Sequence, residues 1–367
     1  MPVPFLDLRA QYENLKGEID TAIQRIIERS AFASGPAVES FEHAFAAYCG
    51  AEHCVGLNSG TAALTLLLKA YGIGPGDEVI TVANTFFATV EAILHVGATP
   101  VLVDCEESTA LIDPQKIEAA ITKKTRAVIP VHLYGQCADM DAIHAIAKKK
   151  NLIVIEDACQ AHGARYRGKR AGSLGHSAAL SFYPAKNLGA FGEAGAVVTS
   201  DSNIANTVRM LRDHGQSQKY HHALAGWNER MDGIQGAVLN VKLKYLDEWN
   251  VKRREHAKKY REQLEGCGDV RFFETREDAE HIYHLFVVRT PRRDALQKHL
   301  KSKGIDTGIH YPIPIHLLEA MRGFGWKRGS FPVAEKLAQE ILSLPMYPEL
   351  TEEQIGEVSL AIGDFFG

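Results

Sequence analysis

One lysine stands in a stretch of small residues, where its amine could act as a nucleophile. Lys186 lies within residues 181–196, which are rich in Gly and Ala and are flanked by apolar runs. Small residues let a flat ligand approach the backbone closely. A lysine held near apolar surface loses hydration, so its amine deprotonates more easily and can form a Schiff base with an aldehyde. A solvated lysine in a turn is the commoner case, so other residues must decide between the two.

Asp157 is a candidate partner for a charged ligand. It directly follows an apolar run at residues 152–156, which is typical of a buried strand. A buried carboxylate is costly unless it is paired, and a protonated heteroaromatic nitrogen would supply the partner. An ion pair with another side chain or a helix cap is the alternative.

Two more features follow short β-branched runs. Ser59, Gly60 and Thr61 form a turn that predicts a helix start, where N–H groups and hydroxyls bind anions, although an ordinary N-cap has the same sequence. Phe86 follows the run at 78–83 and could stack on a flat ligand, although core packing is the commoner role of a single phenylalanine. Together the four features match what pyridoxal phosphate requires: a Schiff-base lysine, an acid for the ring nitrogen, a phosphate site and a stacking ring.

Alternating strands and helices are expected to position these residues. The alternation predicts an α/β fold with a mainly parallel, seven-stranded sheet covered on both faces, and in such sheets ligands bind beyond the carboxyl ends of the strands. The expected strands are 53–57, 78–83, 100–103, 126–131, 152–156, 178–183 and 195–199. The expected helices include 11–29, 61–71, 87–96, 114–121, 139–150, 247–265 and 291–303.

The remaining chain is more polar and is expected to form a second unit. We predict a large domain at residues 1–244, including an N-terminal helix, and a smaller C-terminal α/β domain at residues 245–367. One strand is expected in the smaller domain, at residues 282–289.

The composition excludes several classes of protein. The 367 residues are 46% hydrophobic and carry a net charge of −4, so the chain can bury a large core and has no global attraction to nucleic acid. No apolar run approaches the ~20 residues that span a bilayer, and we expect no membrane association and no signal peptide. The six cysteines form no C-x-x-C pair, which predicts reduced thiols in a cytoplasmic protein and no metal site.

The sequence resembles the DegT/StrS family of sugar aminotransferases, which are pyridoxal phosphate enzymes of fold type I. The resemblance extends over essentially the whole chain. The motifs that carry it are residues 4–8, 35–36, 60–64, 76–80, 130–135, 156–163, 181–196, 213–215, 226–232 and 310–312. In one departure, Ala194 stands where the family often has glycine.

The resemblance implies a role for each candidate residue. Lys186 would form the Schiff base with pyridoxal phosphate and then move a proton, and Asp157 would pair with the ring nitrogen. The other expected cofactor contacts are Gly60, Thr61 and Ser181 at the phosphate, Gln160 at the ring hydroxyl and Phe86 against the ring. The expected substrate contacts are Tyr183, Lys219 and His310. Asn228 would reach the cofactor phosphate of the neighbouring subunit, which predicts a homodimer with shared active sites.

The resemblance also implies a reaction. Glutamate would donate its amino group to a keto group of a nucleotide-linked sugar. The segments at 181–184, 213–216 with 219–220, and 308–316 are most similar to the branch that aminates C-3 of a thymidine-diphosphate (dTDP) 3-keto-6-deoxyhexose. Amination at C-4 of a nucleotide-linked 4-keto sugar is the alternative.

Two other functions are weighed against transamination. A related branch dehydrates sugars and has histidine in place of the Schiff-base lysine, so Lys186 disfavours dehydration. A non-catalytic regulator that binds the cofactor is disfavoured because the catalytic set is complete and the sequence has no basic patch for DNA.

Overall fold

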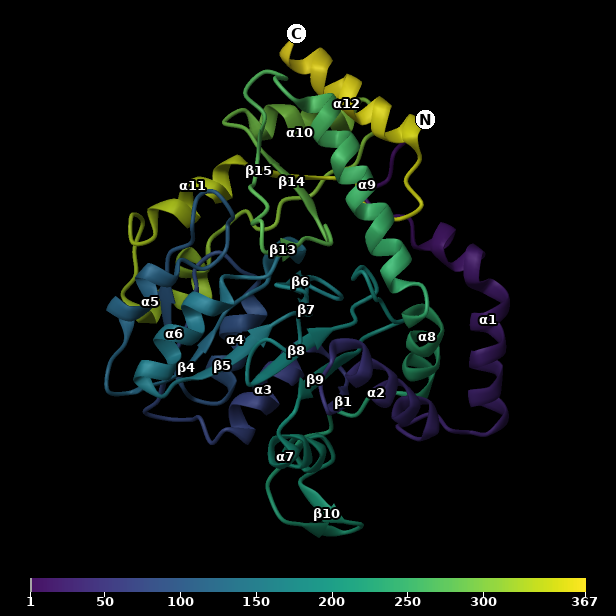
Figure 1. The fold of residues 1–367 in the computed structure, drawn as a ribbon, viewed down its shortest axis with the longest axis vertical. Helices are drawn as coiled ribbons and strands as arrows, with labels where there is room; N and C mark the ends of the chain where they lie inside the picture. Colours follow the sequence, from purple (N-terminus) through teal and green to yellow (C-terminus); the bar gives the residue numbers. More distant parts are fainter. Residues whose placement is uncertain (1) are drawn as a thin grey trace.

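A seven-stranded sheet forms the centre of the molecule (Figure 1), whose computed structural model describes residues 2–367. The strand order is β1-β9-β8-β5-β4-β2-β3. Within this sheet β9 runs antiparallel to both of its neighbours and the other pairs are parallel, so the sheet is mainly parallel. The strands are β1 (His53–Leu57), β2 (Glu78–Val82), β3 (Thr99–Val103), β4 (Thr125–Ile129), β5 (Ile153–Asp157), β8 (Ser177–Ser181) and β9 (Gly195–Thr199).

Helices cover both faces of this sheet. Neighbouring strand residues point to opposite faces, so Val55 joins one apolar core and Cys54 the other. The first face is covered by α3 (Gly60–Ala70), α4 (Phe87–His95) and α7 (Ser202–Arg212). The second face is covered by α2 (Pro36–Cys49), α5 (Pro114–Ala120) and α6 (Met140–Lys150). Each strand buried between two helical layers is therefore a run of apolar residues.

The predicted alternation of strands and helices is confirmed. Each of the seven expected strands overlaps an observed strand, and each expected helix overlaps an observed helix. Local signals set several of the boundaries. Ser59 caps α3 by accepting a hydrogen bond from the Ala62 N–H, and Asp139 caps α6 in the same way through the Ala142 N–H.

The C-terminal part contains a second, smaller sheet with its own core. Val3 lies in this core and forms a parallel bridge with Ile305. A residue near the N-terminus therefore packs with the C-terminal part. The division of the chain into domains at residues 1–244 and 245–367 stays a proposal. The sheet is formed by β12 (Arg271–Phe272), β14 (Phe286–Arg289) and β15 (Ile341–Leu344). The helices packed against it are α9 (Leu246–Leu264), α10 (Arg293–Ser302) and α12 (Glu352–Phe366).

The predicted strand at 282–289 is wrong in its first half. Only Phe286–Arg289 forms the strand β14, and residues 282–285 are irregular. The Ile282 N–H donates to the Gly135 carbonyl at 3.0 Å, in the short helix η1 (Leu133–Gly135). A Cβ at Gly135 would lie 2.8 Å from an Ile282 side-chain carbon, so glycine permits this close docking.

The other elements lie around these two units (Figure 1). Helix α1 (Leu8–Glu28) packs on α8 (Gly233–Leu243) through a small core that includes Ile19 and Trp249. The hairpin of β10 (Gln216–Gln218) and β11 (His221–His222) projects beyond α7. The remaining elements are β6 (Arg165–Tyr166), β7 (Lys169–Arg170), β13 (Ala279–Glu280), η2 (Ile315–Leu317), η3 (Glu319–Phe324) and α11 (Pro332–Glu340). No helix within residues 2–367 is long and apolar enough to cross a bilayer.

Candidate active site

A cavity of about 440 Å³ lies at the carboxyl ends of the parallel strands. The loops that follow β1, β2, β5 and β8 form most of its wall, and the C-terminal part supplies the rest. Nine of the eleven residues expected from the sequence line it: Gly60, Thr61, Phe86, Asp157, Gln160, Ser181, Tyr183, Lys186 and His310. The large sheet and the C-terminal part therefore bring together residues that are more than 200 positions apart in the chain.

Lys186 is held in a tight turn between β8 and β9. Its backbone N–H donates to the Tyr183 carbonyl at 2.8 Å. Its amine lines the cavity, and no residue within 2–367 accepts a hydrogen bond from it. Burial lowers the pKa of Lys186 below its ordinary value, while Cys159 and Asp157 act in the opposite direction. An amine with a lowered pKa is suited to attack an aldehyde.

Asp157 is the last residue of β5, and both of its carboxylate oxygens are held in place. The Thr89 hydroxyl donates to Oδ2 at 2.7 Å, and the Cys159 N–H donates to Oδ1 at 3.2 Å. The residue is 5% exposed. A carboxylate has about four acceptor positions, so Asp157 can still accept a hydrogen bond from a protonated ring nitrogen in the cavity.

The start of α3 forms one end of the cavity and is suited to an anion. The first N–H groups of a helix have no partner within the helix and carry a partial positive charge. A Cβ at Gly60 would lie 2.8 Å from Cys159 Sγ and from Ser181 Cβ, so glycine lets the three loops meet here. Ser181 Oγ accepts a hydrogen bond from the Tyr183 N–H, which leaves its own hydrogen free to donate. With the Thr61 hydroxyl, these groups can hold a phosphate.

Gln160 presents its amide nitrogen to the cavity side. Its Oε1 accepts a hydrogen bond from the Tyr134 N–H at 2.7 Å, which fixes the orientation of the amide because an N–H can only donate. Its Nε2 donates to the Tyr311 hydroxyl at 3.1 Å and has a second hydrogen available.

Phe86 lies beside Tyr311, with ring centroids 5.4 Å apart, and is 55% exposed at the cavity. Its ring is therefore available to stack on a ligand.

His310 and Tyr183 lie at the cavity as expected for substrate contacts. His310 Nδ1 is 2.8 Å from the Ser343 hydroxyl, and its ring stacks on Phe5. Burial lowers the pKa of His310 to about 4, and the positive charge of Lys186 adds to this effect. The imidazole is therefore neutral at neutral pH and can accept or donate one hydrogen bond.

Lys219 and Asn228 lie outside this cavity. Lys219 is in the turn of the β10–β11 hairpin, with its amine 5.3 Å from the Tyr220 ring centroid. Asn228 forms an antiparallel bridge with Asp213 at the base of the same hairpin. A role for Asn228 at a cofactor phosphate, or for Lys219 at a substrate, would therefore be at the site of a second subunit.

Thr89, Tyr311 and His284 are among the cavity residues that were not expected from the sequence. Thr89 orients Asp157, and Tyr311 binds Gln160. His284 lines the cavity from the irregular segment before β14. Thr89 follows Phe86 by less than one helical turn, which is a usable signal. His284 was hidden because residues 282–285 were expected to be strand.

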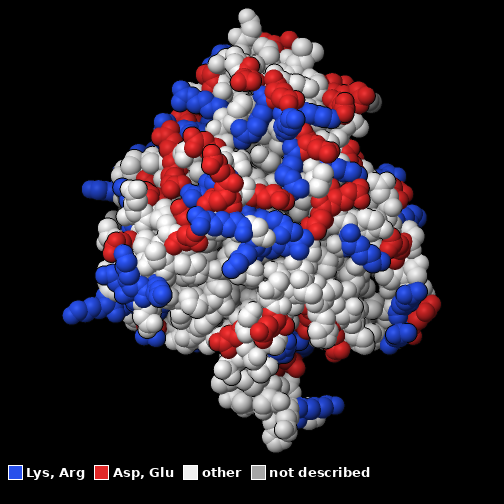
Figure 2. Space-filling model, in the orientation of Figure 1, with Lys and Arg blue, Asp and Glu red and all other residues white. Residues whose placement is uncertain are grey.

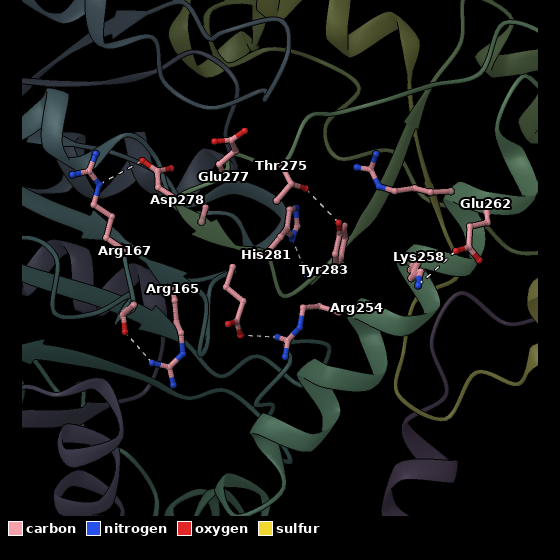
Figure 3. Close-up of a pocket in the computed structure, with 14 residues that line it drawn as sticks. Arg165, Arg167, Arg254, Lys258, Glu262, Thr275, Glu277, Asp278, His281 and Tyr283 are labelled. Atoms are coloured by element: carbon pink, nitrogen blue, oxygen red, sulfur yellow. Dashed lines mark hydrogen bonds and ion pairs between the residues drawn. The ribbon is translucent and has the colours of Figure 1, made fainter.

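A larger hollow lies elsewhere, between α9 and the β6–β7 hairpin (Figure 3). Its charged side chains are largely paired: Arg167 with Asp278, and Arg254 with Glu280. On the face shown in Figure 2, many basic side chains likewise lie next to acidic ones.

Within residues 2–367 there is no group of three or more His, Cys, Asp or Glu placed to hold a metal ion.

A model of the DegT/DnrJ/EryC1/StrS aminotransferase family matches residues 13–362. The chain belongs to this family. One relative is the dTDP-3-amino-3,4,6-trideoxy-alpha-D-glucose transaminase of Streptomyces venezuelae, 49% identical over 99% of this chain and 96% of its own. Another, from Geobacillus stearothermophilus, is named pleiotropic regulatory protein and is 48% identical over 100% of this chain and 99% of its own.

Solved structures of the family agree with this fold. The crystal structure of DesV from S. venezuelae, in complex with a ketimine intermediate, has a TM-score of 0.97 and 49% identity, and the match covers 99% of this chain and 98% of that chain. The predicted fold type is therefore confirmed. Other members of the fold have been solved with pyridoxamine phosphate bound and in the pyridoxal phosphate form. The chain is a family aminotransferase that uses pyridoxal phosphate, and its cavity has the amine, the carboxylate and the anion-binding helix start that this cofactor needs.

Proposed function

We propose that the protein transfers the amino group of glutamate to C-3 of a dTDP-linked 3-keto-6-deoxyhexose. The observation that carries the reaction type is the unpartnered amine of Lys186, in the same cavity as the doubly held carboxylate of Asp157. The sugar is supported by the S. venezuelae relative, whose name specifies a 3-amino dTDP-sugar. Amination at C-4 of a 4-keto sugar is the alternative.

Each cavity residue has a part in this proposal. Pyridoxal phosphate supplies an aldehyde that bonds to amines and a ring that withdraws electrons from the bond being broken. Gly60, Thr61 and Ser181 hold its phosphate, Gln160 contacts its hydroxyl and Asp157 keeps its ring nitrogen protonated. Phe86 stacks on the ring.

Lys186 is the proposed acid–base group. Once released from the cofactor, its Nζ takes a proton from the α-carbon of the amino donor. In the second half of the reaction it delivers a proton to the carbon of the acceptor sugar that receives the amino group. Burial lowers the pKa of Lys186, which favours the neutral form of this amine. Tyr183 and His310 lie at the same cavity and are proposed to bind the sugar.

A homodimer with shared sites is part of the proposal. Asn228 and Lys219 do not line the cavity of their own subunit. We assign Asn228 to the cofactor phosphate, and Lys219 to the substrate, in the neighbouring site. Exposed apolar side chains support an interface in this region, because Tyr220 is 80% exposed and Leu224 is 42% exposed on the same segment. We place the reaction in the cytoplasm, because all six cysteines are unpaired.

The substrate is tested with the two keto sugars. The dTDP-linked 3-keto and 4-keto 6-deoxyhexoses are each offered with glutamate, and kcat/KM is compared. A site that hydrogen-bonds particular sugar groups leaves its own polar groups unpaired with the wrong isomer, so the 3-keto sugar should be strongly preferred. Preference for the 4-keto sugar would overturn the C-3 assignment and leave the aminotransferase reaction intact.

A regulatory function is the second candidate, because the G. stearothermophilus relative is named a pleiotropic regulatory protein. The absorption spectrum of the cofactor-loaded protein separates the two functions. An aminotransferase loses its visible cofactor band when glutamate is added, whereas a regulator that only binds the cofactor keeps the band with every amino donor offered.

A further inference from the structure

The imidazole ring of His310 is packed against Phe5 and Gly308. Phe5 stacks on the ring, with centroids 5.7 Å apart and an interplanar angle of 20°. A Cβ at Gly308 would lie 2.6 Å from His310 Cε1, so glycine leaves room for the ring in this position. Phe5 belongs to the family motif at residues 4–8 and does not itself line the cavity. Its contact with His310 therefore gives this motif a place behind the active site.

The backbone around His310 is tied to both parts of the molecule. Gly308 forms an antiparallel bridge with Ser343 of β15, in which the Gly308 N–H donates to the Ser343 carbonyl at 3.0 Å. The Ser343 N–H donates back to the Gly308 carbonyl at 2.8 Å. The Tyr134 hydroxyl, in η1, donates to the His310 carbonyl at 2.5 Å. The side chain of His310 therefore starts from a fixed backbone.

The hydroxyl of Ser343 determines the state of His310 Nδ1. Ser343 is fully buried in β15 and does not line the cavity. Within residues 2–367 its hydroxyl forms a hydrogen bond only with His310 Nδ1, at 2.8 Å. If Nδ1 carried the hydrogen, the hydroxyl would accept it and its own hydrogen would be buried without an acceptor, which is costly. The hydroxyl therefore donates to a bare Nδ1.

The bare Nδ1 places the ring hydrogen of His310 on Nε2. Burial, with a further contribution from the charge of Lys186, lowers the pKa of His310 to about 4, so the ring carries a single hydrogen near neutral pH. Nε2 has no hydrogen-bond partner in the part of the chain that the structure describes. Because His310 lines the cavity, its Nε2–H is a donor available to a ligand there.

We propose that Ser343 is a positioning residue that fixes His310 as a hydrogen-bond donor to an oxygen of the keto sugar. This assignment rests on the proposed binding of the sugar by His310. Hydroxyl and keto oxygens of a sugar can both accept from such a donor, whereas a bare Nε2 would match only hydroxyls. Without the Ser343 hydroxyl, the neutral ring can hold its hydrogen on Nδ1 instead, and the sugar then loses its donor.

The state of the His310 ring is tested without turnover. Two-bond ¹H–¹⁵N spectra of the protein loaded with pyridoxal phosphate and labelled at histidine distinguish protonated from bare ring nitrogens. The His310→Gln variant identifies the signals. We expect a bare Nδ1 and a protonated Nε2 near neutral pH, and a mixture of the two tautomers in Ser343→Ala. A protonated Nδ1 in the wild-type protein would overturn the proposal, whether or not the protein transfers amino groups.

The effect on the sugar is tested by measuring the two half-reactions separately. Ser343→Ala should lower kcat/KM for the dTDP-linked 3-keto sugar about five- to tenfold, the scale of one neutral hydrogen bond. The rate at which glutamate bleaches the cofactor band should stay within about twofold of the wild-type rate, because no sugar takes part in that step. Ser359→Ala is the matched control and should change neither value, since Ser359 is a buried serine of α12 whose hydroxyl has no hydrogen-bond partner within residues 2–367.

Thermal unfolding shows whether both serine variants remain folded. Equal slowing of the two half-reactions in Ser343→Ala would mean that this serine only supports the fold, and would overturn the proposal. An unchanged kcat/KM for the sugar would also overturn it. If glutamate bleaches the wild-type protein but neither keto sugar is accepted, the proposed function fails, while the spectra still show whether Ser343 sets the protonated nitrogen of His310.

Discussion

Thr89 and Asp157 are joined by a 2.7 Å hydrogen bond whose direction is fixed, because a carboxylate can only accept it. The Thr89 hydroxyl must then accept from Thr85, whose hydroxyl oxygen lies 2.9 Å away. This small chain orients the acid that we assign to the ring nitrogen of the cofactor.

The first prediction concerns this hydrogen bond. Thr89→Val preserves the shape of the side chain and removes the donor, so cofactor binding should weaken by about 10- to 100-fold, the scale of a hydrogen bond to a charged group. Titration of the cofactor by absorbance measures this. Thr65→Val is the matched control, because Thr65 is also buried but its hydroxyl has no hydrogen-bond partner within residues 2–367. Equal effects of the two substitutions would contradict the assigned role.

The second prediction concerns the nucleophile. Lys186→Ala should lower turnover by several orders of magnitude, as is found when a nucleophile is removed. Borohydride reduction of the loaded wild-type protein, followed by peptide mass spectrometry, should place the cofactor on Lys186. Lys242 is the internal control, since burial lowers the pKa of this lysine to about 8 but it lies outside the cavity. A cofactor adduct on Lys242, or more than a tenth of wild-type activity in Lys186→Ala, would contradict the assignment.

The third prediction concerns the shared site. Lys186→Ala and Asn228→Ala subunits should each be nearly inactive alone. Mixed dimers should recover activity, because one of the two sites then contains wild-type residues from both subunits. Differently tagged subunits allow the hybrids to be isolated and assayed. No recovery in isolated hybrids would mean that Asn228 does not serve the neighbouring site.

The fourth prediction concerns stability. Glu156 is fully buried, and both of its carboxylate oxygens accept two hydrogen bonds each. The donors are the N–H groups of Gly172, Leu174 and Gly175 and the Nε2–H of His132. Glu156→Gln turns one oxygen into a donor that faces other donors, so the free energy of unfolding should fall by about 2–3 kcal/mol. Urea unfolding measures this change.

Glu118→Gln is the control for that experiment, since Glu118 is exposed on α5. The free energy of unfolding of the Glu118→Gln variant should stay within about 0.5 kcal/mol of the wild-type value. If Glu156→Gln were equally mild, the buried hydrogen bonds would have little net effect on stability.

The fifth prediction concerns the stability of the folded protein at acidic pH. Burial, with a further contribution from the charge of Lys186, lowers the pKa of His162 to about 3, against about 6.5 in an unfolded chain. Between these pH values the unfolded state binds the extra proton, so this histidine makes stability fall as pH falls from about 6.5 toward 3, by up to about 1.4 kcal/mol per pH unit. His162→Leu should make the pH dependence of unfolding shallower over this range, and His43→Leu, at an exposed position on α2, should not. If the free energy of unfolding of His162→Leu depended on pH as steeply as that of the wild-type protein, the lowered pKa of His162 would be contradicted.

The strands were predictable because their signals are local. β-Branched runs between turn residues mark each strand of the large sheet, and a parallel sheet then places the residues after those strands at one edge. Lys186 and Asp157 could be expected at one site for this reason. The conformation at 282–285 was not predictable, because its backbone partners are Gly135 and Tyr134, far back in the chain. His284 was missed for the same reason.

Val3 gives the order of synthesis a consequence for folding. Its N–H donates to the Gly304 carbonyl, its own carbonyl accepts from the Asp306 N–H, and its side chain is fully buried. A ribosome adds roughly 5–20 residues per second, so Val3 is made on the order of 15–60 s before these partners. Val3 therefore reaches its place only after Gly304 and Asp306 have been made, when the strands of the large sheet can already pair with one another.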